Sequence, residues 1–257
     1  AWLVRASPGR CTGQQGDSVH GLPIRPPRGR LARMCNLYAL TKGQQALRDL
    51  ARALELGPVR DDLGNLPSLP ALYPDSEAPI IGIGAQAGEV TGPILKLARW
   101  GMPSPAFALE GKSVDRGVTN IRNTASPHWR RWLGPKHRCL VPFTSFAEHV
   151  KTNTGFQPLW FAPREAAETP PCFAGLATRW TGTRKKAEGE VTLTLFGFLT
   201  CPPNADVAPH HPKAMPVVLT ELDEMRAWLT ADWADAAVLQ RPLPDGALVV
   251  LGFEGEG

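Results

Sequence analysis

A cysteine directly follows Met34, and this position gives Cys35 a chemistry that an internal cysteine lacks. If Met34 is the initiator and is removed, Cys35 carries an α-amine and a thiol on adjacent carbons. The amine can condense with an aldehyde to an imine, and the thiolate can then close a five-membered thiazolidine ring. Both groups react near neutral pH, because their reference pKa values are about 7.7–8.0 for the amine and about 8.5 for the thiol. The alternative interpretation is a small, buried, inert cysteine.

Two residues could move the protons that such a condensation requires. Glu148 is flanked by apolar residues such as Phe146 and Val150, and burial beside them would raise the pKa of its carboxyl and suit it to proton transfer. It could also be a solvated charge on an edge strand. His211 has an ordinary pKa that suits acid–base chemistry. It could instead be a structural loop histidine, and its neighbour His210 is equally available.

The elements that must position these residues are mainly strands. Runs of apolar and β-branched residues predict strands over Ile80–Ile83, Ile94–Trp100, Cys139–Val150, Pro158–Ala162, Cys172–Trp180, Val191–Thr200 and Met215–Leu219. Gly and Pro, 25 and 26 of the 257 residues, supply many turns between them. The pattern favours an α+β fold: a single domain with a central antiparallel, barrel-like or sandwiched β-sheet and flanking helices.

Helical periodicity is clearest over residues 41–56. Apolar residues recur there at helical spacing, with Thr41 as a possible N-cap and Gly57 as a stop; the stripe consists of Leu47, Leu50, Ala51 and Leu54. Two shorter helices are expected, one over His128–Leu133 and one over Glu221–Leu229 after Thr220. No internal repeat is visible.

Four separated segments together resemble one known family. They are Met34-Cys35-Asn36-Leu37-Tyr38, Thr119-Asn120-Ile121-Arg122-Asn123-Thr124, Ser145-Phe146-Ala147-Glu148 and His211-Pro212-Lys213-Ala214-Met215-Pro216. In this order they are similar to the SOS-response-associated peptidase (SRAP) family, also described as abasic site processing proteins. The resemblance runs from Met34 to about Gly252 and takes in Arg99-Trp100-Gly101 and Arg138-Cys139-Leu140-Val141-Pro142.

The resemblance implies a DNA-repair function with four catalytic residues. Cys35 would form a thiazolidine crosslink with the aldehyde of an abasic site in single-stranded DNA and so protect the lesion. Asn120 would orient the amino-terminal cysteine and the sugar through its amide. Glu148 would assist opening of the sugar ring and shuttle protons, and His211 would protonate or stabilise the ring-opened sugar oxygen.

The resemblance also implies a set of DNA contacts. Arg122 would bind a phosphate, and Trp100, preceded by Arg99, would stack on an unpaired base, an interaction worth about 1–3 kcal/mol per base. Lys213 and Thr200 complete the expected DNA-binding set. Without the family, Trp100 would be assigned to the core, and Asn120 and Arg122 could merely cap a turn and lie on the surface.

Three departures from the family pattern affect these assignments. Asn36-Leu37 stands where many members have Gly-Arg, so a phosphate contact there is lost. His149 follows the glutamate in place of an aromatic residue, which removes a residue that would wedge between bases. The histidine motif is one residue longer than the common form, and Lys213 would supply its positive charge.

The charge is unevenly distributed along the chain. Residues 1–33 hold six arginines and one acid, whereas the remaining chain is nearly neutral, with 22 basic and 23 acidic residues. Bulk charge therefore gives no support for DNA binding, which must depend on a local site. We expect residues 1–33 to be a disordered basic arm or upstream sequence translated from a wrong start codon, and residues 34–257 to form the SRAP-like domain. While the extension is attached, Cys35 has no free amine.

The five cysteines form no CxxC pair, and no apolar run reaches the length of a membrane span. Neither a zinc site nor a disulfide framework is indicated, and residues 1–33 lack a secretory signal. We expect a cytoplasmic, nucleoid-associated monomer without metal or organic cofactor, whose partner is single-stranded DNA containing abasic sites.

Two other functions remain open from the sequence. Cys35 could be the amino-terminal nucleophile of a cysteine peptidase that removes its own upstream segment or cleaves other proteins. The chain could also be a non-catalytic module that binds single-stranded DNA, although its near-neutral main part provides no general electrostatic groove.

Overall fold

The computed structural model describes residues 36–86, 89–165 and 169–253, and its main feature is a closed ring of strands. The strands of this barrel are β4 (Glu77–Gln86), β5 (Glu89–Trp100), β7 (Arg138–Pro142), β10 (Cys172–Thr183) and β11 (Glu190–Cys201). Neighbours pair antiparallel in the order β5-β4-β7-β10-β11. A parallel pairing of β11 with β5, at Leu195↔Arg99 and Phe196↔Trp100, closes the ring. Closure removes the unpaired strand edges that an open sheet would expose.

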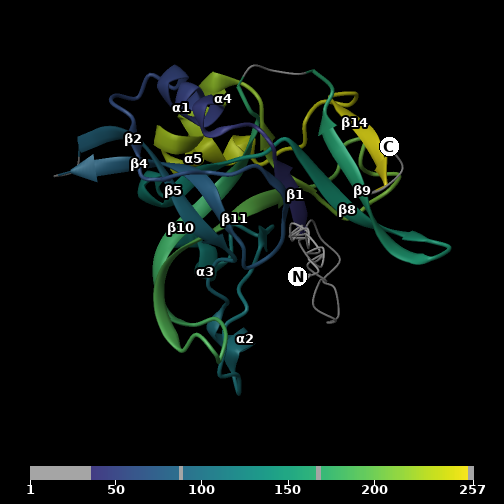
Figure 1. Cartoon of the computed structure of the whole chain (residues 1–257), viewed down its shortest axis with the longest axis horizontal. Helices are drawn as coiled ribbons and strands as arrows, with labels where there is room; N and C mark the ends of the chain where they lie inside the picture. Colours follow the sequence, from purple (N-terminus) through teal and green to yellow (C-terminus); the bar gives the residue numbers. More distant parts are fainter. Residues whose placement is uncertain (1–35, 87–88, 166–168, 254–257) are drawn as a thin grey trace, which may run out of the picture. The chain divides into compact units, whose positions relative to one another are not determined.

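A second, fully antiparallel sheet stands beside the barrel (Figure 1). Its order is β14-β9-β8-β1-β3, with bounds β1 (Leu37–Leu40), β3 (Leu69–Leu72), β8 (Ser145–Thr152), β9 (Gly155–Pro163) and β14 (Leu248–Phe253). Figure 1 shows β8 and β9 as a long hairpin with β14 alongside β9. The chain passes from barrel strand β7 to β8 through Phe143 and Thr144 alone, so the two sheets are tied at this corner.

Short strands extend the barrel where its site residues lie. β6 (Asn120–Ile121) runs parallel to β11, and β12 (Met215–Pro216) runs antiparallel to the end of β11. β13 (Val218–Leu219) pairs with β10, and β2 (Arg60–Asp61) pairs with β5. The β11 strand thus carries a separate short partner on each side of its carboxyl end.

The helices are short and cover the sheets. They are α1 (Gln44–Ala53), α2 (Ala106–Leu109), α3 (Pro127–Arg130), α4 (Leu222–Thr230) and α5 (Trp233–Ala236), with 3₁₀ turns η1 (Pro135–His137) and η2 (Ala237–Leu239). Among the described residues, no helix combines the length and the apolar character that crossing a bilayer requires.

An aromatic cluster joins the two sheets into one core. Tyr38 of β1 meets Trp100 of β5 edge-on with ring centroids 5.1 Å apart, and Trp100 stacks on Phe198 of β11 at 5.2 Å. Phe173 of β10 packs on Phe198 at 4.5 Å and on Phe146 of β8 at 6.1 Å. Edge-on and offset ring pairs of this kind add about 0.5–1.5 kcal/mol each beyond the burial of their surface.

The α+β fold class, with a single domain and a barrel-like sheet, is confirmed. The predicted apolar stripe of α1 is buried. The predicted N-cap Thr41 is wrong: the N-cap is Gly43, and the backbone N–H and hydroxyl of Thr41 donate to the Thr144 hydroxyl. The single strand predicted over Cys139–Val150 is wrong: the chain turns at Phe143 and Thr144, which separate β7 from β8.

Trp228 fastens α4 to the barrel, and its replacement should weaken the fold. The buried indole Nε1 donates to the carbonyls of Cys139 at 3.0 Å and Gly175 at 3.2 Å. Trp228→Phe keeps an aromatic ring but removes both hydrogen bonds, so we expect a loss of about 1–3 kcal/mol in the free energy of unfolding by urea. Val238→Ala, at a side chain 70% exposed, is the control and should change it by less than about 0.5 kcal/mol. Equal stability of the Phe variant and the parent would contradict this role.

Candidate functional site

Glu148 and His211 form a buried pair between the second sheet and the barrel. Glu148 lies on β8, and His211 lies in the loop that joins β11 to β12. His211 Nδ1 is 3.1 Å from Glu148 Oε2, and the two residues are 6% and 1% exposed. The structure therefore brings together the two residues that the sequence predicted for proton transfer.

The strand register explains why a carboxyl group is buried here. Alternate residues of a strand share a face, so Glu148 points to the same side as Phe146, which lies in the aromatic core. Burial raises the pKa of the Glu148 carboxyl, and the contact with His211 opposes this only in part. A carboxyl group with a raised pKa keeps its proton to higher pH and can serve as an acid.

The loop around His211 fixes the orientation of the imidazole. The backbone N–H of His211 donates to the carbonyl of Val207 at 2.8 Å, and Nδ1 donates to the carbonyl of Ala214 at 2.9 Å. Because a carbonyl oxygen can only accept a hydrogen bond, the contact with Ala214 places the ring proton on Nδ1. In the neutral ring, Nε2 is then the proton acceptor.

The start of the described chain is tied to the Asn120 segment. The Thr119 hydroxyl donates to Asn36 Oδ1 at 3.0 Å, and Asn120 Nδ2 donates to the Thr119 hydroxyl at 3.0 Å. Leu37 pairs with Ala147, so one further step of the antiparallel pairing brings the backbone of Asn36 beside Glu148. Asn36 and Thr119 thus link the start of the described chain to Asn120; the sequence marked Asn36 only as a departure from the family pattern.

Three of the predicted DNA-binding residues are also brought together. Arg122 Nη1 donates to the carbonyl of Lys213 at 2.6 Å. Gln240 Nε2 donates to the carbonyls of Arg122 at 2.9 Å and Thr200 at 3.0 Å. Arg122 and Lys213 are exposed, whereas Thr200 is buried. Gln240 stands in no motif, and nothing in the sequence indicated that it would link these segments.

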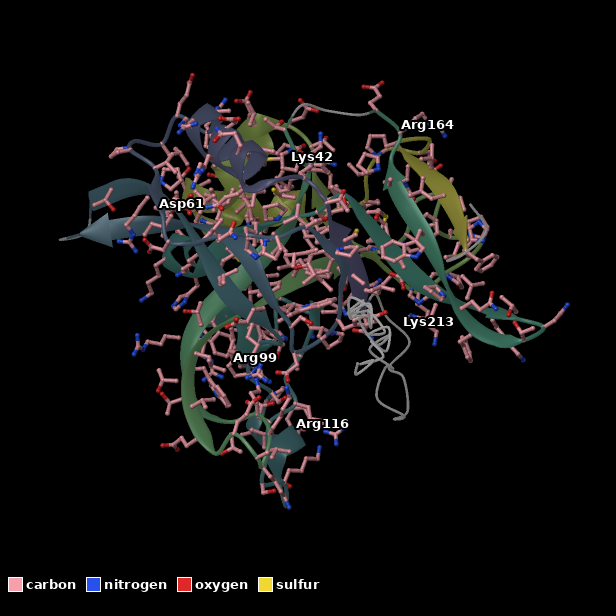
Figure 2. All side chains as sticks on the ribbon, viewed as in Figure 1. Lys42, Asp61, Arg99, Arg116, Arg164 and Lys213 are labelled. Carbon is pink, nitrogen blue, oxygen red and sulfur yellow. The ribbon has the colours of Figure 1, made fainter. Side chains whose placement is uncertain are left out.

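Trp100 and Arg99 do not take the predicted DNA-binding roles. Trp100 is 1% exposed, packs in the aromatic core and donates from Nε1 to the carbonyl of Thr119 at 3.3 Å, so no base can stack on it. Arg99 binds Asp75 and Glu188 through its guanidinium. Figure 2 shows Arg99 well apart from Lys213. Sequence could not separate a core tryptophan from a stacking one; here Trp100 supports the backbone beside Asn120.

His149 adds a second imidazole beside the pair. It is half-buried on β8, and its pKa is lowered by burial and by the positive charge of His211. A neutral ring therefore stands where the family pattern has an aromatic residue.

Cys35 lies outside the described residues. The described cysteines, Cys139, Cys172 and Cys201, are buried, and burial raises the pKa of the Cys139 and Cys201 thiols to about 12. Such thiols are protonated at neutral pH and are poor nucleophiles. In the described part of the chain, no three His, Cys, Asp or Glu side chains are placed to hold a metal ion together.

Comparison with known proteins identifies one family. The model of the family described as SOS response associated peptidase (SRAP) matches residues 34–251. No curated protein matches.

Solved structures share the fold. A protein from Bordetella bronchiseptica is 24% identical with a TM-score of 0.61, over 85% of this chain and 99% of its own. A protein from Bacteroides thetaiotaomicron is 21% identical with a TM-score of 0.61, over 84% and 90%. A phage-related protein from Bordetella bronchiseptica is 20% identical with a TM-score of 0.57, over 85% and 93%.

The raised pKa of Glu148 predicts a pH-dependent cost to stability. A carboxyl group whose folded-state pKa is raised stabilises the fold below its unfolded pKa, and this contribution is lost as the pH rises through the folded pKa. Glu148→Gln removes that loss. The variant should match the parent in chemical unfolding at about pH 4 and exceed it increasingly toward about pH 8.

Glu190→Gln, at an exposed position on β11, is the control and should show no such trend. A Glu148→Gln protein that is less stable at every pH would mean that the contact with His211 outweighs burial.

Proposed function

Because the chain belongs to the SOS response associated peptidase (SRAP) family, we propose that it binds single-stranded DNA at abasic sites and captures them covalently through Cys35. The observation that carries the proposal is the buried contact of Glu148 with His211 beside the backbone of Asn36. Cys35 is joined to Asn36 by one peptide bond, and consecutive Cα atoms are about 3.8 Å apart. This short tether supports a reaction of Cys35 at the pair.

The proposed reaction needs proton transfers that this pair can perform. The α-amine of Cys35 adds to the aldehyde carbon of the ring-opened deoxyribose and gives a carbinolamine. Loss of water then forms the imine: the departing hydroxyl takes a proton from the Glu148 carboxyl, and the resulting carboxylate takes up the proton that the nitrogen releases. The sulfur then adds to the imine carbon, and the proton lost by the thiol ends on the nitrogen. The thiazolidine therefore forms with release of one water, and no oxidant or reductant is consumed.

The two acid–base groups have different parts in this scheme. Glu148 is the acid because burial favours its protonated form. His211 accepts or donates a proton at Nε2 when the sugar ring opens, since Nδ1 is held by the Ala214 carbonyl. Asn120, fixed through Thr119, orients the amine and the sugar. Catalysis by positioned acid–base groups contributes about 10²- to 10⁴-fold in rate.

The DNA backbone would be held by local contacts. Arg122 and Lys213 are both exposed, and the Arg122 guanidinium donates to the backbone carbonyl of Lys213. Guanidinium and ammonium groups at adjacent positions bind phosphates of a single strand. Thr200 supports this surface through its backbone, which Gln240 links to Arg122.

The crosslink itself is the first test. Protein that starts at Cys35, incubated with single-stranded DNA containing one abasic site, should give an adduct that survives a denaturing gel. Cys35→Ala should give none, and Glu148→Gln should form it about 10²- to 10⁴-fold more slowly, because it lacks the acid. Glu190→Gln is the control and should react at the parental rate.

An unchanged adduct yield in Cys35→Ala would refute the nucleophile. Protein that retains residues 1–33 should also give no adduct, since its Cys35 nitrogen is in a peptide bond. Binding without an adduct, and equally to undamaged DNA, would identify a non-catalytic binding module.

The description of the family as a peptidase favours a second candidate function. Cys35 would then attack a peptide carbonyl, and the chain would cleave itself before Cys35 or cleave other proteins. Mass spectrometry of purified full-length chain should then show loss of the first 34 residues, abolished in Glu148→Ala and His211→Ala. A full-length chain that stays intact while the Cys35-start form still crosslinks DNA would exclude self-cleavage.

A further inference from the structure

A cavity at the barrel is lined by neutral and basic residues. Its volume is about 280 Å³, and all of the barrel strands and η1 contribute to its wall. The described lining contains Lys96, Lys136, His137, Arg138 and Arg179, but neither Asp nor Glu. A concave surface with one sign of charge concentrates ions of the opposite sign.

Lys96 projects toward the interior of the barrel. It shares a face of β5 with Ala98 and Trp100, which are 2% and 1% exposed, and it pairs with the buried Ile80 on β4. Lys96 as a whole residue is half-buried, and within the described part of the chain its ammonium group forms no ion pair. Its positive charge lowers the pKa of the thiol of Cys139, another residue of the wall, although the opposite effect of burial is larger.

Arg138 is a buried cation with unmatched donors. It is 1% exposed, and one of its amino groups donates to the carbonyl of Ala231. Its Nε and Nη1 are buried and donate no hydrogen bond to any described residue. Asp232 attracts the guanidinium only from beyond ion-pair distance, and burial lowers its pKa to about 10. The Arg138 side chain lies on the face of β7 opposite to that of Cys139, with its guanidinium carbon 5.5 Å from the centroid of the Trp228 ring, so it adds positive charge behind the wall without entering the cavity.

We propose that this cavity binds a phosphate group, either as inorganic phosphate or as the phosphate of a mononucleotide. Lys136 and Arg179 are exposed at its rim, and no carboxylate among the described residues pairs with either of them. The hydroxyl of Thr194, which pairs with Arg179 across the strands and shares its face, can add a neutral donor. Its volume falls just below the range of about 300–1,000 Å³ typical of sites for larger ligands, which fits a small anion.

The phosphate site is distinct from the Glu148–His211 pair. Neither Glu148 nor His211 lines the cavity. Val207 and Ala214, whose carbonyls hold His211, do not line it either. The inference therefore stands whether or not Cys35 forms a DNA adduct, and its test requires no crosslinking.

Calorimetric titration of the full chain with sodium phosphate, at ionic strength held constant with sodium chloride, tests the proposal. We expect saturable binding that weakens about tenfold or more in the double variant Lys96→Gln, Arg179→Gln, because two charged donors are lost. The matched control, Lys112→Gln with Lys151→Gln, removes the same charge at exposed positions outside the cavity and should bind as the parent does. Lys96→Arg, which keeps the charge, should retain binding.

No saturable binding to the parent, or equal weakening in the two double variants, would overturn the site. Competition by deoxyadenosine monophosphate and by deoxyadenosine distinguishes the sources of phosphate. Tighter binding of the nucleotide than of phosphate assigns a mononucleotide, whereas equal or weaker binding assigns the free ion. Competition by the nucleoside alone would contradict recognition of phosphate.

Discussion

The carboxyl group of Glu148 is kept out of water where the two sheets meet, and its burial against His211 governs the site. Glu148 comes from the second sheet, and His211 comes from a loop of the barrel. The pair exists only if both sheets are held in one relation. The aromatic core holds the sheets together: Phe146, two residues before Glu148 on β8, packs against Phe173 on β10. Core packing therefore sets the acid–base properties of the site.

The same dependence extends to the Asn120 segment. Trp100 is buried in the aromatic core, yet its indole donates to the Thr119 carbonyl, and the Thr119 hydroxyl donates to Asn36. A core side chain thus positions the segment that holds the side-chain amides of Asn36 and Asn120. Rigid support of this kind is what a site needs when its reacting groups must meet within a fraction of an ångström.

The sequence predicted the parts of the molecule that local pattern controls. The buried stripe of α1 and the apolar surroundings of Glu148 follow from spacing and composition. The β1 strand, four residues long, carries too few residues for a periodic signal. At the turn, only Thr144 and Ser145 separate two apolar runs, too short a gap to distinguish two strands from one. The roles of Trp100 and Gln240 depend on neighbours far along the chain, which spacing cannot reveal.

The parallel pairing of β11 with β5 has a consequence for the order of folding. It joins segments roughly a hundred residues apart, and contacts of such separation form late because loop closure costs entropy first. The β6 strand pairs with β11 as well, so the backbone of Asn120 cannot take its position in the sheet until β11 has been synthesised. During translation, a nascent chain therefore carries Glu148 before the histidine that completes the pair exists. The Glu148–His211 pair can therefore form only late in synthesis.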